Sequence, residues 1–151
     1  MNMNFETFYT SFFATMAFGI IFNVPKRSMI SGGIIGMLGW ALYIWLTGQY
    51  HFDMVFATLI AAFFVATVSQ LLARYHKMPV TVFSVSGIIP LVPGGLAYDT
   101  MRHFVENDYS IAIKYATKTL LISGAIAFGL IFSGVISQIL RRNDNANVKE
   151  D

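Results

Sequence analysis

The fold is decided by one uncharged stretch, residues 80–98, which reads VTVFSVSGIIPLVPGGLAY. It is long enough for a helix that crosses a bilayer, since about 20 apolar residues span the hydrocarbon core. Pro90 and Pro93 each lack an N–H group and clash with the preceding helical turn. A continuous helix would leave two carbonyl groups without partners, those of Ser86 and Ile89. Two glycines follow and loosen the helix further. Because lipid offers no hydrogen bonds, we expect a discontinuous helix that faces the protein interior.

The composition excludes several classes of protein. The 151 residues are 56% hydrophobic and only 12% charged, with a mean hydropathy of +0.61. Soluble domains carry about 25% charged residues, so this chain is neither disordered nor an ordinary soluble enzyme. The formal net charge of +2 is too small for a nucleic-acid binder. Cysteine is absent, which excludes disulfides, thiolate catalysis and cysteine-ligated metal sites.

Short clusters of charge separate five apolar segments. They predict an all-α integral membrane protein with about five transmembrane helices, the fourth broken by proline and glycine. The expected spans cover approximately residues 5–24, 29–47, 54–73, 80–98 and 119–140. We expect a single membrane domain over residues 1–142 and a polar cytoplasmic tail over residues 143–151. The only charge before the first apolar run is Glu6, where a signal peptide would carry Lys or Arg, so we expect a retained span.

Basic residues predict the orientation, because loops rich in Lys and Arg stay in the cytoplasm. They follow the first, third and fifth segments, at Lys26, Arg27, Arg74, Lys77, Arg141, Arg142 and Lys149. The loop between the second and third segments contains no Lys or Arg. We therefore expect a multi-pass protein of the cell (inner or plasma) membrane, with its N-terminus outside and its C-terminus in the cytoplasm.

Small residues recur at helical spacing in three of the segments. They are Ala125, Gly129, Ser133 and Ser137 in the fifth, Gly32 and Gly36 in the second, and Ala57 and Ala61 in the third. Small residues four positions apart let helices approach closely in a membrane. Such patterns also arise without specific contacts in segments rich in glycine and alanine, and both interpretations stay open.

A broken helix within the membrane is typical of secondary transporters, which bind substrate where the helix unwinds. Free carbonyl groups accept hydrogen bonds from ammonium groups, and helix N-termini donate to carboxylates, so a small zwitterion suits both. The expected substrate pathway consists of Ser84, Ser86, Gly87, Pro90, Pro93, Gly94 and Gly95, with Tyr98 and Asn23 as secondary candidates and Thr81 as a further hydroxyl. The alternatives are a purely structural proline kink and, for Asn23, a helix cap.

Polar residues after the break allow two interpretations. One helical face carries Asp99, Arg102, His103 and Glu106. His103 with Asp99 or Glu106 would suit a proton relay. The alternative is a solvated outer loop with local ion pairs. Lys114 and Lys118 share another face, where they either attract anions or anchor the helix at the membrane edge.

Sequence motifs of enzymes are absent. The chain has no GxSxG, HExxH, P-loop or GxGxxG pattern. His51, His76 and His103 are scattered and form no pair at the spacing of metal ligands. We therefore expect no catalytic residues, no metal and no cofactor.

Several short motifs resemble those of a known family. The chain carries Phe22-Asn23-Val24-Pro25, Pro79 followed by Val82-Phe83, the core Ile88-Ile89-Pro90-Leu91-Val92-Pro93-Gly94, and Ala97-Tyr98 with Met101. These motifs resemble the threonine/serine exporter family in its short form, the small (YjjB-type) subunit. The resemblance implies a helical membrane protein that works with a larger membrane subunit of the same family. It also implies export of threonine and serine, or of a dicarboxylate such as succinate.

The sequence thus predicts one subunit of a two-component secondary exporter of small polar metabolites. Two alternatives remain open. A homo-oligomeric channel would conduct without a partner, and a non-transporting membrane assembly factor would bind a partner without changing metabolite flux. Because no charge lies between Lys77 and Asp99, recognition at the break would depend on backbone dipoles and hydroxyl groups.

Overall fold

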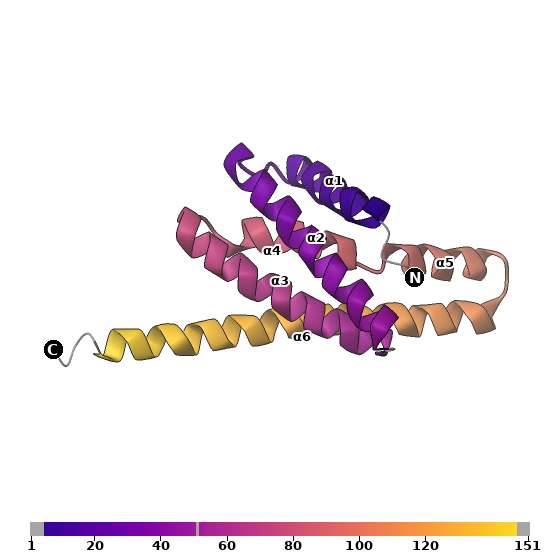
Figure 1. The fold of residues 1–151 in the computed structure, drawn as a ribbon. Helices are drawn as coiled ribbons and strands as arrows, with labels where there is room; N and C mark the ends of the chain where they lie inside the picture. Colours follow the sequence, from indigo (N-terminus) through magenta and orange to yellow (C-terminus); the bar gives the residue numbers. More distant parts are fainter. Residues whose placement is uncertain (1–4, 51, 148–151) are drawn as a thin grey trace.

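The computed structural model describes residues 5–50 and 52–147, and the regular structure of these residues is helical throughout (Figure 1). The elements are α1 (Phe5–Ile21), α2 (Lys26–Gln49), α3 (Met54–His76), α4 (Val80–Ile88), η1 (Ile89–Leu91), α5 (Gly94–Val105) and α6 (Tyr109–Asn147). The described ranges hold no strand, which confirms the all-α membrane fold. His51 and residues 148–151 of the predicted tail lie outside the described residues.

The helices form a bundle on one long helix. Figure 1 shows α6 running the length of the molecule, with α3 lying on it and α1, α2 and α4 on the other side of α3. α3 packs on α6, α2 packs against α1 and α3, and α4 contacts both α2 and α3. α5 leaves this bundle and lies beside the first turns of α6. The short helix before the break therefore packs against α1, α2 and α3, and its residues Phe83, Ser86, Gly87 and Ile88 are buried.

The interface between α3 and α6 confirms the prediction of close packing at small residues. A Cβ atom added to Gly129 would lie 2.9 Å from the backbone nitrogen of Phe63 and 3.0 Å from the carbonyl oxygen of Leu59. Ala57 and Ala61 on α3 are fully buried. Only a residue without a side chain lets the two backbones approach this closely.

Hydrogen bonds continue the same interface toward the C-terminal end of α3. The hydroxyl oxygens of Thr67 and Ser133 lie 3.1 Å apart, and Gln70 Nε2 donates to Ser133 Oγ at 2.9 Å. One turn further, Arg74 donates to Ser137 Oγ at 2.8 Å. The small residues predicted on the fifth span therefore serve both packing and hydrogen bonding between helices.

The predicted glycine pair on α2 also packs closely, but each glycine meets a different helix. A Cβ on Gly32 would lie 3.4 Å from the Cβ of Ser86 on α4. A Cβ on Gly36 would clash with the side chain of Thr15 on α1. α2 is thus held on two sides at once.

The number of membrane crossings stays a prediction. Three helices are long and apolar enough to span a membrane, within Ser28–Gln49, Met54–His76 and Tyr109–Ile139. α4 with η1 and α5 forms a fourth candidate, either a broken span or a re-entrant loop. The apolar part of α1, Phe8–Ile21, is shorter than the other spans. Five crossings therefore require α1 to cross as a short helix and the broken pair to cross as one span.

Helix α6 is longer than the predicted fifth span at both ends. It begins at Tyr109, so much of the expected outer loop is helical, and it continues through Asn147 into the expected tail. The predicted start followed the charge of Lys118, yet the turns before Lys118 pack on α5 and stay helical. Tertiary contacts, and not only hydropathy, determine where this helix begins.

Candidate functional site

The helix break lies between α4 and α5, which are bent by 52°. α4 ends at Ile88, and one 3-10 turn containing Pro90 follows. Pro93 stands directly before Gly94, the first residue of α5. Both prolines therefore occupy the start of a helical element, where a missing N–H group costs no intrahelical hydrogen bond. The break predicted from the sequence is present, and the two prolines explain its position.

Backbone groups at the break find partners within the turn itself. The Ile89 carbonyl, which a continuous helix would leave without a partner, accepts a hydrogen bond from the Val92 N–H at 3.2 Å. The Val92 and Pro93 carbonyls accept from Gly94 and Ala97 at 2.8 Å and 3.0 Å. The reason is the tight turn, because a 3-10 turn bonds residues three apart instead of four. Side chains beside the break therefore matter more than the sequence suggested.

A cavity of about 240 Å³ lies against the break. It is lined by Trp40, Tyr43, Met54, Thr58, Pro90, Leu91, Val92, Pro93, Gly95, Leu96 and Ile122. Trp40 Nε1 is buried and has no hydrogen-bond partner among the described residues. The Thr58 hydroxyl donates to the Met54 carbonyl on its own helix at 2.8 Å. The wall of the cavity is therefore mostly apolar, and the unpaired Trp40 Nε1 is shielded from the open space beside it.

Three of the predicted pathway residues, Pro90, Pro93 and Gly95, line this cavity. Gly94 stands beside them, and a Cβ atom added to either glycine would meet nothing within 4 Å. Neither glycine has a positive φ. The two glycines thus leave open space at the break; close helix packing and unusual backbone angles do not explain them.

Gly87 and Ser86 instead face neighbouring helices. A Cβ on Gly87 would lie 2.7 Å from Ile35 Cγ2 and 2.8 Å from Val65 Cγ1. Ser86 is buried, and its hydroxyl donates to the Val82 carbonyl at 3.0 Å. Both residues shape the packing of α4 and are not part of the cavity wall.

The remaining pathway candidates also lie outside the wall of this cavity. Asn23 follows α1 with a φ of 54°, and its N–H donates to the Ile20 carbonyl at 3.0 Å, which fits the cap interpretation. Tyr98 on α5 is 69% exposed, and Ser84 on α4 is half-buried.

The polar face of α5 carries local ion pairs. Arg102 Nε lies 2.9 Å from Glu106 Oε1, with both side chains about half exposed. His103 Nδ1 lies 3.7 Å from Glu106 Oε2, and the His103 ring stacks on Tyr115 with centroids 5.6 Å apart. Asp99 is half-buried one turn before this cluster. The exposed i,i+4 pair is the arrangement that the solvated-loop interpretation predicts.

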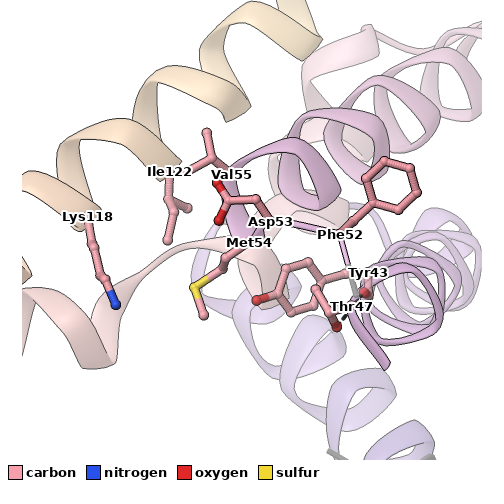
Figure 2. Close-up of a pocket in the computed structure, with 8 residues that line it drawn as sticks. All are labelled: Tyr43, Thr47, Phe52, Asp53, Met54, Val55, Lys118 and Ile122. Carbon is pink, nitrogen blue, oxygen red and sulfur yellow. Dashed lines mark hydrogen bonds between the residues drawn. The ribbon is translucent and has the colours of Figure 1, made fainter. Parts of the chain in front are cut away.

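A second pocket, of about 430 Å³, adjoins the first near the turn between α2 and α3 (Figure 2). The two share Tyr43, Met54 and Ile122. The other lining residues are Thr47, Phe52, Asp53, Val55 and Lys118. In Figure 2 the Lys118 side chain reaches in from α6, while the Asp53 carboxylate comes from the start of α3. This pocket, unlike the first, therefore carries one acidic and one basic side chain.

Sequence reasoning did not single out Trp40, Tyr43, Thr58 or Asp53. A tryptophan within an apolar span and an aspartate at the start of a helix are ordinary residues for those places. Only the fold brings them beside the break, since Trp40 and Tyr43 lie on α2 while Asp53 and Thr58 lie at the start of α3. The one usable signal was Lys118, whose charge at the membrane edge was recognised as able to attract an anion.

Known proteins show the family of this chain. Residues 7–136 match the family described as threonine/serine exporter, ThrE. An uncharacterized protein of Haemophilus influenzae is 30% identical over 131 residues, which cover 80% of this chain and 43% of that relative. The chain thus spans less than half the length of the curated relative it matches, and no solved structure matches it. Since the family match covers most of its residues, the chain belongs to the threonine/serine exporter family.

Proposed function

We propose that this chain is the small subunit of a two-component secondary exporter of small polar metabolites in the cell membrane. The family is one of membrane transporters and not of enzymes. The substrate is a threonine/serine-type amino acid or a dicarboxylate such as succinate. The observation that carries the proposal is the cavity at the helix break, which Pro90, Pro93 and Gly95 line.

Partnership with a larger membrane subunit is supported by the length of the Haemophilus influenzae relative. The matched region covers only 43% of that protein, so the relative has room for a second membrane half. In the proposal a separate subunit of the same family supplies that half. It would enter the membrane in the opposite orientation, so that two broken helices face one another across the pathway.

We propose roles first for the residues of the break. Pro90 and Pro93 hold the bend, and Gly94 and Gly95 leave the space through which substrate passes. The Trp40 ring forms part of the apolar wall of the cavity. The other proposed pathway residues are Ser84, Ser86, Gly87, Tyr98 and Asn23, and proton coupling is assigned to Asp99 or His103.

Metabolite export from three strains tests the proposal. One strain makes this chain alone, one makes a larger subunit of the same family alone, and one makes both. Export of threonine, serine or succinate only from the third strain supports the two-component exporter. Flux from this chain alone, independent of the proton gradient, would instead indicate a homo-oligomeric channel. A chain that co-purifies with the larger subunit but changes no flux would be an assembly factor.

A further inference from the structure

We propose that the second pocket, between the α2–α3 turn and α6, holds both charged ends of a zwitterionic amino acid. The Asp53 carboxylate takes the ammonium group, and the Lys118 ammonium takes the carboxylate. The inference rests on the proposed export function. It adds a binding site outside the helix break and a physical reason for choosing amino acids over dicarboxylates.

Among the described residues, neither charged group has an ion-pair partner. Asp53 directly precedes α3, a position where a carboxylate often caps the helix, yet its side chain makes no capping hydrogen bond. Within the described residues, no ion pair of 4.0 Å or less involves Asp53 or Lys118, and the pairs found there both use Glu106. Two opposite charges therefore line one pocket without neutralising each other.

The shape of the pocket suits a small zwitterion. Its volume of about 430 Å³ lies within the range of roughly 300–1,000 Å³ typical of small-molecule sites. Met54 and Ile122 provide apolar contacts for a short side chain, and Figure 2 shows the Tyr43 hydroxyl directed toward the same space. A ligand with one positive end, one negative end and a small body uses every part of this wall.

The same charges disfavour a dicarboxylate. Such a ligand would gain one attraction, to Lys118, and one repulsion, from Asp53. Both side chains are exposed, so solvent and salt weaken each contact. The pocket therefore binds its ligand weakly and selectively, as suits a transient binding step during transport.

The shared walls connect this site with the break. Tyr43, Met54 and Ile122 line both spaces, so the charged pocket directly adjoins the break cavity. In the orientation predicted from basic residues, the turn between α2 and α3 faces outward. The pocket then lies on the exit side of an exporter.

Binding of radiolabelled threonine to the purified full chain in lipid nanodiscs tests the site. The competitors are threoninol, which lacks the carboxylate, N-acetylthreonine, which lacks the ammonium group, and succinate. The wild type should bind threonine about tenfold more tightly than any of the three. Asp53→Asn should weaken threonine binding and let N-acetylthreonine compete equally. Lys118→Gln should also weaken threonine binding, and it should let threoninol compete equally with threonine.

Lys114→Gln is the matched control, because Lys114 lies one turn earlier on α6 and does not line the pocket. It should leave all affinities unchanged. The site is overturned if the wild type binds no threonine, or if Asp53→Asn and Lys118→Gln keep the wild-type order of competitors.

Threonine export by this chain together with the larger subunit distinguishes the claim of a binding site from the claim of an exporter. If the two subunits export threonine but both variants bind it with wild-type affinity, the binding site is contradicted and the exporter function stands. If threonine binding depends on Asp53 and Lys118 but the two subunits together export no threonine, the exporter function is contradicted and the binding site stands.

Discussion

At the scale of single residues, the glycines of the broken helix separate into two kinds. Gly87 lies against Ile35 and Val65, where a Cβ atom would come within 2.8 Å of both side chains. Gly94 and Gly95 face open space, with nothing within 4 Å of an added Cβ. The first kind serves packing. The second kind leaves open space at the break, where Gly95 lines the cavity and Gly94 precedes it.

Gly87→Ala should destabilise the protein, and Gly95→Ala should not. The new methyl group at position 87 forces the Ile35 and Val65 side chains to move, at a cost of about 1–3 kcal/mol. Thermal unfolding in detergent measures the difference as a lower melting temperature for Gly87→Ala alone. Equal melting temperatures for the two variants would show that α4 is not packed as described.

At the scale of elements, the proline positions explain the chain's helix boundaries. Pro25 and Pro79 stand directly before α2 and α4, as Pro93 does before α5. Pro90 differs from these because it follows α4 within a single 3-10 turn. It is therefore the proline that stops a helix which would otherwise continue.

Pro90→Ala should abolish export while membrane insertion stays normal. Alanine restores an N–H group that can donate to the Ser86 carbonyl, so α4 extends and the 52° bend is lost. Pro79→Ala is the control, since a helix already begins at that position. Export is measured at equal membrane abundance. Export at the wild-type rate from Pro90→Ala would show that transport does not require the bend between α4 and α5.

Much of this arrangement was predictable from local sequence, and the rest depends on contacts between distant segments. Hydropathy and proline positions predicted the helices and the break. The start of α6 at Tyr109, ten residues before the expected span, depends on the contacts of its first turns with α5. The bond from Val92 to the Ile89 carbonyl depends on a 3-10 turn that no propensity specifies. Trp40 lines the break cavity and Asp53 lines the second pocket, and both spaces form only when α2, α3 and α6 pack together.

At the scale of the whole molecule, the absence of cysteine makes the topology directly measurable. Each introduced cysteine is then the only thiol in the chain. Suitable positions lie in the four turns that separate the candidate spans, at Asn23, Tyr50, Lys77 and Asn107. These turns separate every candidate span from the next.

Five crossings predict two groups of cysteine variants. Tyr50→Cys and Asn107→Cys should react with an impermeant maleimide from outside, while Asn23→Cys and Lys77→Cys should react only after permeabilisation. Tags on the N- and C-termini should lie outside and inside, respectively. Labelling of positions 77 and 107 from the same side would make the broken pair a re-entrant loop. Termini on one side would end the inverted pairing with a larger subunit.

The central claim is that substrate passes through the open space at the helix break, and Gly94→Leu tests it most directly. Gly134→Leu on α6 is the matched control, because neither glycine has a neighbour within 4 Å of an added Cβ. Export by the pair of subunits is compared at equal membrane abundance. The account predicts that Gly94→Leu abolishes export and that Gly134→Leu leaves it intact. Wild-type export rates from Gly94→Leu would contradict it.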